Sequence, residues 1–183
     1  METQKFKGRR IVLGVCGSIA AYKAADLVSA LAKAGADVRV IMTKNAAKII
    51  SERVFATLSR NPVSVDMWEK IGDWKPGHIS LAQFAELMIV APATANTIGN
   101  FANGLAPDLL SCAFLATRAK VLIAPAMNEA MYSNFAAQKN IKYLRENGVE
   151  FVEPEEGALA CGDCGKGRLA PVDSILKKAA ELL

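Results

Sequence analysis

A chain of 183 residues, 52% hydrophobic but only 7% aromatic, fits one domain of ordinary size whose core is mainly aliphatic. The net charge of +4 is modest and spread along the sequence, so no basic stripe points to nucleic acid. No apolar run approaches the ~20 residues of a membrane-spanning helix, and the polar N-terminus is unlike a secretory signal. We therefore expect a cytoplasmic protein with no nucleic-acid or membrane partner.

Apolar, β-branched runs predict strands at intervals along the chain. Each is continuous rather than alternating, which is typical of strands buried on both faces of a parallel sheet. The runs are Arg10–Val15, Asp37–Met42, Leu87–Ala91, Lys120–Ala124 and Val149–Val152.

Helical patterns separate these runs. Between the first two, Ala20, Ala24, Leu27 and Leu31 lie on one helix face, and Gly35 ends the pattern. Further helices are predicted over Ala46–Ser59, Pro107–Ala116, Asn134–Asn147 and Val172–Leu183. The alternation predicts an α/β fold, in which residues 1–183 form a single doubly wound, Rossmann-like domain with a mainly parallel sheet.

Two segments have no regular pattern, and no linker divides the chain into two domains. Asn61–Gly77 is irregular, and we expect a loop there. Glu153–Arg168 is rich in glycine, and we expect a second, mobile loop.

The first strand leads into a small-residue turn and a helix start at Cys16–Lys23, which is a natural anion site. Ser18 can cap that helix or bind a phosphate oxygen, and the turn alone does not decide between the two. The dinucleotide spacing G-x-G-x-x-G is absent, and the second strand ends at Thr43 instead of an acidic residue. Both features favour a mononucleotide over NAD.

Two later strands end in similar motifs, Ala91–Thr97 (APATANT) and Ala124–Asn128 (APAMN). Proline stiffens a turn, alanine permits the close approach of a flat ring, and threonine or asparagine supplies hydrogen bonds. Well-capped helix starts would also explain either motif. Their repetition at strand ends, where an α/β sheet binds ligands, favours a binding site.

Five motifs occur in the order found in a known family: Gly17–Lys23 (GSIAAYK), Gly77–Leu81 (GHISL), Pro92–Asn100 (PATANTIGN), Pro125–Tyr132 (PAMNEAMY) and Ala160–Leu169 (ACGDCGKGRL). Together they span nearly the whole chain. The sequence resembles the homo-oligomeric flavin-containing cysteine decarboxylases, most of all those that convert 4'-phosphopantothenoylcysteine to 4'-phosphopantetheine in coenzyme A synthesis.

The resemblance implies FMN as cofactor and assigns site residues. The expected FMN contacts are Gly17, Ser18, Ile19, Thr43, Thr94, Ala95, Asn96, Thr97 and Ala126. His78 and Cys161 match catalytic positions, and Asn128, Met131 and Lys23 match substrate-binding positions, with Lys23 expected near the substrate phosphate. Cys164 departs from the pattern of many relatives and receives no role.

The family's chemistry gives these side chains their tasks. FMN oxidises the cysteine thiol to a thioaldehyde, which accepts the electron pair as CO2 leaves, and the enethiolate is then protonated and reduced. Asn128 can hold the carboxylate without adding a charge, although an N-cap is an equal explanation. His78 is the only histidine and can act as acid or base, although a lone histidine is more often structural. Cys161, a mostly protonated thiol, can donate the final proton.

Cysteine usage leaves a competing interpretation open. Cys16 and Cys112 lie within apolar stretches, and we expect reduced thiols instead of a disulfide framework. A zinc or redox pair at Cys161 and Cys164 is the alternative to a proton donor. Zinc requires four ligands, and the sequence has one histidine and no second C-x-x-C, so we expect no metal.

Other members of the fold remain alternatives. A peptidyl-cysteine decarboxylase of lantibiotic maturation stops at the enethiol and has no need of Cys161. A flavin prenyltransferase fits the motifs poorly, and a non-catalytic flavoprotein subunit would not require the three residues His78, Asn128 and Cys161 together. The family also implies trimers, or dodecamers assembled from trimers, and a phosphopantothenate–cysteine ligase that is fused or separate; no ligase domain is recognised in this sequence.

Overall fold

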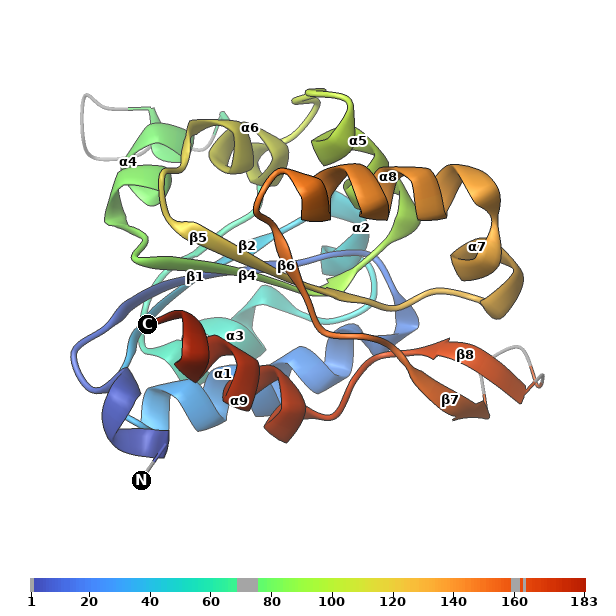
Figure 1. Ribbon diagram of the computed structural model, residues 1–183. Coiled ribbons are helices and arrows are strands. Elements are labelled where there is room, and N and C mark those ends of the chain that lie inside the picture. Colours follow the sequence, from blue (N-terminus) through green and yellow to red (C-terminus); the bar gives the residue numbers. More distant parts are fainter. Residues whose placement is uncertain (1, 69–75, 159–161, 163) are drawn as a thin grey trace.

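The computed structural model of the chain describes residues 2–68, 76–158, 162 and 164–183, and it shows a sheet between two layers of helices (Figure 1). The parallel sheet has the strand order β3-β2-β1-β4-β5-β6. Its strands are β1 Arg10–Val15, β2 Asp37–Met42, β3 Val63–Ser64, β4 Leu87–Ala93, β5 Lys120–Pro125 and β6 Glu150–Phe151. The order reverses between β1 and β4, which makes this the switch point of a doubly wound sheet.

Helices cover both faces of the sheet. The helices below it in Figure 1 are α1 Lys23–Lys33, α3 Glu52–Ser59 and α9 Val172–Leu182, and those above it are α4 Gly77–Phe84, α5 Ala95–Ala102, α6 Leu109–Ala116 and α8 Phe135–Glu146. Short helices η1 Glu2–Phe6, η2 Ile19–Tyr22, α2 Lys44–Ala47 and α7 Glu129–Ser133 complete the set among the described residues. A separate antiparallel hairpin pairs β7 Glu155–Ala158 with β8 Cys164–Arg168.

Each central strand contributes to two hydrophobic cores. Along β4, Leu87, Ile89 and Ala91 pack on the side of α1 and α9, whereas Met88 and Val90 pack on the side of α5 and α6. All five side chains are fully buried. This two-sided burial explains why the strands read as unbroken apolar runs, and it confirms the predicted α/β class.

Helix prediction was less accurate where a polar side chain starts a new helix. The single helix predicted over Ala46–Ser59 is wrong: the chain forms α2 and then α3, because the Ser51 side chain accepts a hydrogen bond from Arg53 N at 3.3 Å and caps a fresh start. The helix predicted from Pro107 begins at Leu109, since Asp108 and Ser111 form a capping box.

The two expected loops contain structure. The short strand β3 lies within the irregular segment Asn61–Gly77, and α4 begins at its end. The expectation of an unstructured loop over Glu153–Arg168 is wrong for β7 and β8, whereas residues 159–161 and 163 lie outside the described part. Cys161, with the role predicted for it, is therefore also outside the described residues.

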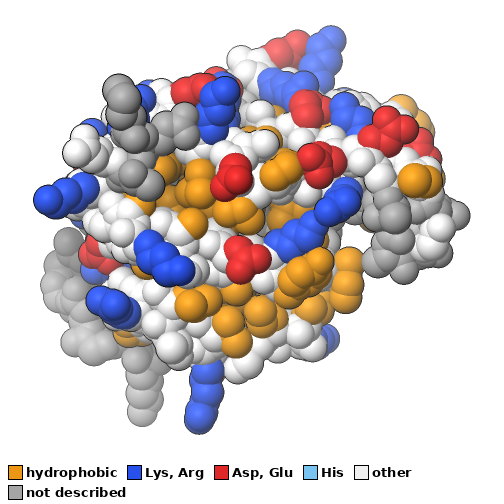
Figure 2. Space-filling view, turned by 90° about the horizontal axis from the view of Figure 1, so that it is seen from below, with side chains coloured by type: hydrophobic (Ala, Val, Ile, Leu, Met, Phe, Trp, Pro, Cys, Tyr) orange, Lys and Arg blue, Asp and Glu red, His pale blue; other side chains and the backbone are white. Residues whose placement is uncertain are grey.

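The surface carries mixed charge. On the face that contains α1 and α9, basic and acidic side chains are interspersed, with hydrophobic side chains showing between them (Figure 2). None of the helices in the described part of the chain has both the length and the apolar character that a bilayer crossing requires.

Candidate functional site

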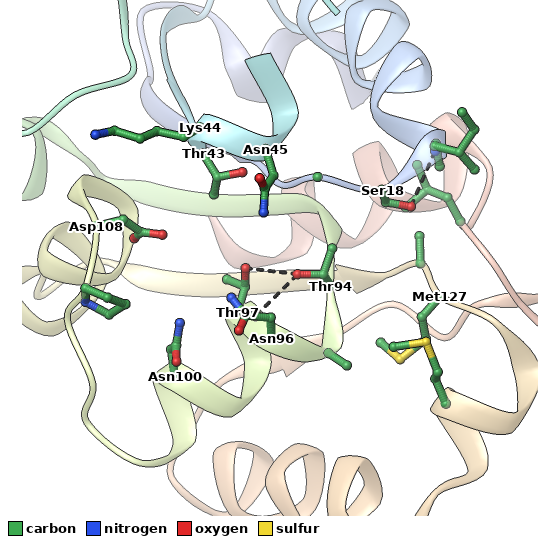
Figure 3. Close-up of a pocket in the computed structure, with 18 of the residues that line it drawn as sticks. Ser18, Thr43, Lys44, Asn45, Thr94, Asn96, Thr97, Asn100, Asp108 and Met127 are labelled. Carbon is green, nitrogen blue, oxygen red and sulfur yellow. Dashed lines mark hydrogen bonds between the residues drawn. The ribbon is translucent and has the colours of Figure 1, made fainter. Parts of the chain in front are cut away.

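A cavity of about 1260 Å³ lies at the carboxyl ends of the strands, at the switch point between β1 and β4. This is where doubly wound sheets bind their ligands. The walls come from the segments that follow β1, β2, β3, β4 and β5, from the start of α6, and from the end of β8. Figure 3 shows side chains from the first, second, fourth and fifth of these segments around one open space.

Most residues predicted from the sequence meet in this cavity. All the expected FMN contacts line it: Gly17, Ser18, Ile19, Thr43, Thr94, Ala95, Asn96, Thr97 and Ala126. The expected substrate-binding residues Lys23, Asn128 and Met131 line it as well. The structure thus brings these side chains together, while the individual roles stay predictions.

Four of these residues cap helices at the cavity. Ser18, Thr43, Thr94 and Asn128 each accept a hydrogen bond from a backbone N–H two or three residues ahead, at 3.4, 3.2, 3.3 and 2.9 Å. The sequence left cap and ligand as alternatives, and the structure shows the caps. A hydroxyl has one donor proton and two acceptor lone pairs, so the capping hydroxyls of Ser18 and Thr43 keep a proton for a phosphate oxygen. Thr94 instead gives its proton to Thr97, because the Thr97 proton goes to Cys16. Capping and ligand binding are therefore compatible roles.

The Thr97 hydroxyl forms its hydrogen bonds within the protein, at the floor of the cavity. Its Oγ1 lies 3.1 Å from Thr94 Oγ1 and donates to Cys16 Sγ at 3.2 Å (Figure 3 shows the first of these contacts). Because Cys16 follows β1 and Thr97 lies in the first turn of α5, the two bonds tie the ends of β1 and β4 together. Thr97 thereby holds the floor of the cavity in place.

Cys16 is a poor nucleophile in this setting. Complete burial raises the pKa of its thiol to about 11, and the hydrogen bond from Thr97 lowers it only in part. A low-dielectric surrounding disfavours the thiolate, which is the reactive form. The thiol therefore stays protonated at neutral pH and has a structural role.

Gly17 is required by its neighbours. A Cβ at this position would lie 2.6 Å from Asn45 Cβ and 3.1 Å from the Asn45 backbone carbon, closer than ordinary contacts allow. The turn after β1 thus packs directly against α2. The resemblance implied that Gly17 contacts FMN, and the structure adds a close approach within the protein.

Sequence reasoning missed a charged side of the cavity. Lys44 Nζ lies 2.8 Å from Asp66 Oδ2, and both residues line the cavity beside the exposed Trp68. The hydrogen bond from Lys44 holds the pKa of the Asp66 carboxyl below its usual range. Asp66 and Trp68 lie in the segment predicted only as a loop, where neither periodicity nor a motif marked them.

His78 lies apart from the other predicted residues. It belongs to the first turn of α4, which packs against α6, and it is not among the described residues that line the cavity. Its Nδ1 is buried and has no hydrogen-bond partner in the described part of the chain. One copy of this chain therefore does not bring His78 to Asn128.

The β7–β8 hairpin also contributes to the cavity. Met127 N donates to Gly167 O at 3.0 Å, so β8 is joined to the turn that follows β5. Gly167, Arg168 and Leu169 form part of the cavity wall. The hairpin is consequently a component of the site, which the prediction of a loop there did not specify.

Fold and cavity together define a doubly wound nucleotide-binding domain that lacks the dinucleotide fingerprint and gathers capped helix starts at its switch point. Sequence comparison gives the family: the flavoprotein family matches residues 1–183, and the chain belongs to it.

Curated relatives are similar over nearly the whole chain. The coenzyme A biosynthesis bifunctional protein CoaBC of Bacillus subtilis is 48% identical over 171 residues, which is 93% of this chain and 42% of that protein. The chain thus spans less than half the length of this bifunctional relative. A probable phosphopantothenoylcysteine decarboxylase of Streptococcus mutans is 42% identical over 96% of this chain and 99% of its own length.

Solved structures give the same result in three dimensions. A mutant PPC decarboxylase complexed with pantothenoylaminoethenethiol superposes with a TM-score of 0.82 at 30% identity, covering 94% of this chain and 97% of that one. The FMN-dependent cysteine decarboxylase SpaF superposes with a TM-score of 0.85 at 30% identity, covering 96% and 97%. Both likenesses extend over more than nine-tenths of the chain.

We predict that the cysteines differ sharply in reactivity. Iodoacetamide at pH 8 should alkylate the exposed Cys164 and leave Cys16 unmodified in the folded protein, because burial and a raised pKa both suppress the Cys16 thiolate. Peptide mass spectrometry reads both sites, and unfolding in guanidinium should make Cys16 reactive. Alkylation of Cys16 at the rate of Cys164 in the native protein would contradict this assignment.

Proposed function

We propose that this chain binds FMN and decarboxylates 4'-phosphopantothenoylcysteine to 4'-phosphopantetheine, a step of coenzyme A biosynthesis. The observation that carries the proposal is the cavity itself, since the residues that the family uses for cofactor and substrate line one space at the switch point. The match to the Streptococcus mutans relative along 99% of its length supports it.

The described residues fit FMN. Ser18 and Thr43 place hydroxyl groups at capped helix starts, which suits a phosphate, and Ala95 and Ala126 leave room for a flat ring. The cavity exceeds the ~300–1,000 Å³ of common ligand pockets, so it has space for a cofactor and a substrate. When bound, FMN supplies the oxidation of the substrate thiol and the return of its electrons, chemistry that side chains do not supply.

The chain's own residues would bind and orient the substrate and protonate the enethiolate. Asn128 would hold the substrate carboxylate by its amide, and a neutral partner does not oppose CO2 loss as a full positive charge would. Lys23 would meet the substrate phosphate, and Met131 the apolar part of the substrate. Cys161 would protonate the enethiolate, since a thiol with a pKa of ~8.5 keeps its proton at neutral pH.

We further propose that the active unit is a homo-oligomer, either a trimer or a dodecamer assembled from trimers, in which His78 serves the cavity of a neighbouring copy. Two observations support this. His78 is absent from the cavity of its own chain, and Trp68 and Phe135 are 84% and 83% exposed although they are large and aromatic. Contact with a second copy would cover such side chains.

Two further assignments follow from the same proposal. A phosphopantothenate–cysteine ligase, fused or separate, would supply the substrate, in keeping with the match to part of a bifunctional coenzyme A protein. The cytoplasm is the compartment that suits this metabolism, and the described cysteines Cys16, Cys112 and Cys164 are free thiols there.

A peptidyl-cysteine decarboxylase is the second candidate, because the likeness to the FMN-dependent cysteine decarboxylase SpaF at a TM-score of 0.85 supports decarboxylation of a cysteine without specifying the rest of the substrate. The two functions differ in substrate and in end product. A peptide with a C-terminal cysteine, offered beside 4'-phosphopantothenoylcysteine, separates them, because the proposed enzyme should act on the small phosphorylated substrate alone.

The first test combines cofactor, activity and Asn128. Purified protein should be yellow and release FMN on denaturation, and it should convert 4'-phosphopantothenoylcysteine to a product of the mass of 4'-phosphopantetheine. Asn128→Asp should abolish CO2 release while FMN remains, because aspartate still caps α7 but repels the substrate carboxylate.

Asn134→Asp is the matched control. Asn134 caps α8 with a hydrogen bond of the same 2.9 Å length and does not line the cavity, so this variant should keep wild-type turnover. A colourless protein that cannot be reconstituted with FMN would contradict the proposed FMN-dependent activity. Equal turnover of the two variants would show that Asn128 caps α7 and does not bind the substrate carboxylate.

Cys161→Ser should separate the halves of the reaction. Serine is a far weaker acid, so the variant should oxidise substrate and release CO2 but accumulate a product two hydrogens lighter than 4'-phosphopantetheine. Cys164→Ser is the control and should be mild. If Cys164→Ser blocks reduction and Cys161→Ser does not, the proton donor is the other thiol, and if neither matters, the peptide substrate becomes the better candidate.

The shared site is tested by complementation. Light scattering should give a multiple of three subunits, and His78→Asn and Asn128→Asp should each be inactive alone. Co-expressed, they should regain about a quarter of the wild-type activity, the share of sites that combine two intact side chains by random assembly across a heterologous interface. A fully active monomer, or no regain in a mixed oligomer, contradicts the shared site.

A further inference from the structure

The helix that begins at Asn128 is too short to hold its own position. It is α7, Glu129–Ser133, with five residues, whereas isolated helices shorter than ~12–15 residues are marginal in water. Asn128 Oδ1 accepts a hydrogen bond from Ala130 N at 2.9 Å, and Asn128 O accepts one from Tyr132 N at 2.9 Å. The direction of the Asn128 amide therefore depends on the contacts that fix α7 to the rest of the protein.

Tyr132 provides such contacts on the side of α7 that faces away from the cavity. It is only 7% exposed and belongs to the hydrophobic core that also contains Ile141 and Leu144 of α8. Its hydroxyl donates to Glu153 Oε2 at 2.8 Å, and its carbonyl oxygen accepts from Gln138 Nε2 at 2.6 Å. Neither Tyr132 nor Glu153 is among the described residues that line the cavity. Both can therefore influence the site only through the residues that they hold.

Glu153 makes this attachment ionic. Lys166 Nζ of β8 lies 3.1 Å from Glu153 Oε2, and Arg145 of α8 bonds Oε1. Burial raises the pKa of the Glu153 carboxyl, but the hydrogen bonds from Tyr132, Lys166 and Arg145 lower it further, so the carboxyl is ionised at neutral pH. Hydrogen bonds to an ionised acceptor are roughly twice as strong as neutral ones. One carboxylate thus joins α7 to α8 and β8.

The turn before α7 has a second attachment. Met127 N donates to Gly167 O at 3.0 Å, and a Cβ at Gly167 would collide with the Met127 carbonyl oxygen, so β8 lies directly against this turn. Asn128 consequently lies between a backbone bond at Met127 and the side-chain bond at Tyr132. Loss of the second leaves the helix side of Asn128 with fewer restraints.

We propose that Tyr132 and Glu153 are positioning residues for substrate binding, which hold α7 so that the Asn128 amide meets the substrate carboxylate. The inference rests on the proposed role of Asn128 and extends it to two residues outside the cavity. A hydrogen bond weakens steeply as its angle departs from linear, whereas apolar contact is non-directional. A small displacement of α7 should therefore cost the bond from Asn128 more than the apolar contact expected of Met131.

Two ligands isolate the carboxylate in the test. In 4'-phosphopantothenoylserine a hydroxyl replaces the thiol of the proposed substrate, so binding is measured without thiol oxidation, and the matching ethanolamine compound also lacks the carboxylate. Titration calorimetry on the FMN-loaded protein gives both dissociation constants. Tyr132→Phe should weaken binding of the serine ligand about tenfold and that of the ethanolamine ligand by no more than about twofold, while FMN is retained.

The chain offers a matched control for each variant. Tyr143→Phe should change neither constant, because Tyr143 lies in α8, is 52% exposed, and its hydroxyl has no hydrogen-bond partner among the described residues. Glu153→Gln keeps an acceptor for Tyr132 but loses the charge, so it should give a smaller loss of the same kind. Glu150→Gln should give none, although Glu150 is as exposed as Glu153 and pairs with Lys178 at 3.1 Å.

A double-mutant cycle shows whether Tyr132 acts through Asn128. Asn128→Ser keeps a capping side chain but loses the amide, so it should itself bind the serine ligand more weakly. Adding Tyr132→Phe should then cost nothing further, because the group that Tyr132 positions is already absent. Two losses that simply add would overturn the positioning role.

Amide exchange tests the attachment of α7 without any ligand. The Ala130 amide, which donates to Asn128 Oδ1, should exchange about tenfold faster in Tyr132→Phe than in the wild type or in Tyr143→Phe. Unchanged exchange, or an equal loss of affinity for both ligands, would overturn the inference. If the wild-type protein binds neither ligand, the proposed function fails, and faster exchange at Ala130 still supports the attachment of α7 through Tyr132.

Discussion

The site depends on one constraint of parallel sheets, namely that every strand delivers its carboxyl end to the same edge. At this edge, β1, β2, β4 and β5 are each followed by a helix whose first backbone N–H groups need hydrogen-bond partners. Ser18, Thr43, Thr94 and Asn128 meet this need after β1, β2, β4 and β5. Because α1 and α5 leave toward opposite faces of the sheet (Figure 1), a space opens between the capped turns. The sheet geometry thus creates both the cavity and its polar lining.

Within that space the side chains divide their work by depth. At the floor, Cys16 and Thr97 bond to each other and are buried, so they maintain shape. On the walls, the capping hydroxyls of Ser18 and Thr43 retain protons to donate. On the charged side, Lys44 and Asp66 pair beside Trp68, and β8 closes the wall beyond Met127. The proposed decarboxylation uses the walls, whereas the Cys16–Thr97 bond at the floor holds the ends of β1 and β4 together.

The predictable part of the structure is the part encoded locally. The strand bounds of β1 and β2 were predicted correctly because two-sided burial leaves an uninterrupted apolar run. The break between α2 and α3 depended on Ser51, whose capping a helical pattern does not reveal. The two-residue strand β3 carries too little pattern to be seen, and glycine-rich β8 becomes a strand only by pairing with β7 and resting on Met127.

The site divides in the same way. Strand ends and family motifs identified the cavity residues, since both are features of contiguous sequence. The ion pair between Lys44 and Asp66 joins the start of α2 to the segment after β3, so no local pattern in the sequence indicates it. The separation of His78 from Asn128 is likewise a fact of tertiary arrangement. The tertiary arrangement of the elements, not spacing in the sequence, decides which of these groups meet.

The completed caps around the cavity have a consequence for the protein without its cofactor. Each cap and the Cys16–Thr97 bond are formed by protein groups alone, so the binding surface is preorganised. A ligand that enters a preorganised surface does not spend part of its binding free energy on ordering loops. Loss of the cofactor should therefore leave a folded apoprotein that can be reloaded rather than a chain that must fold again.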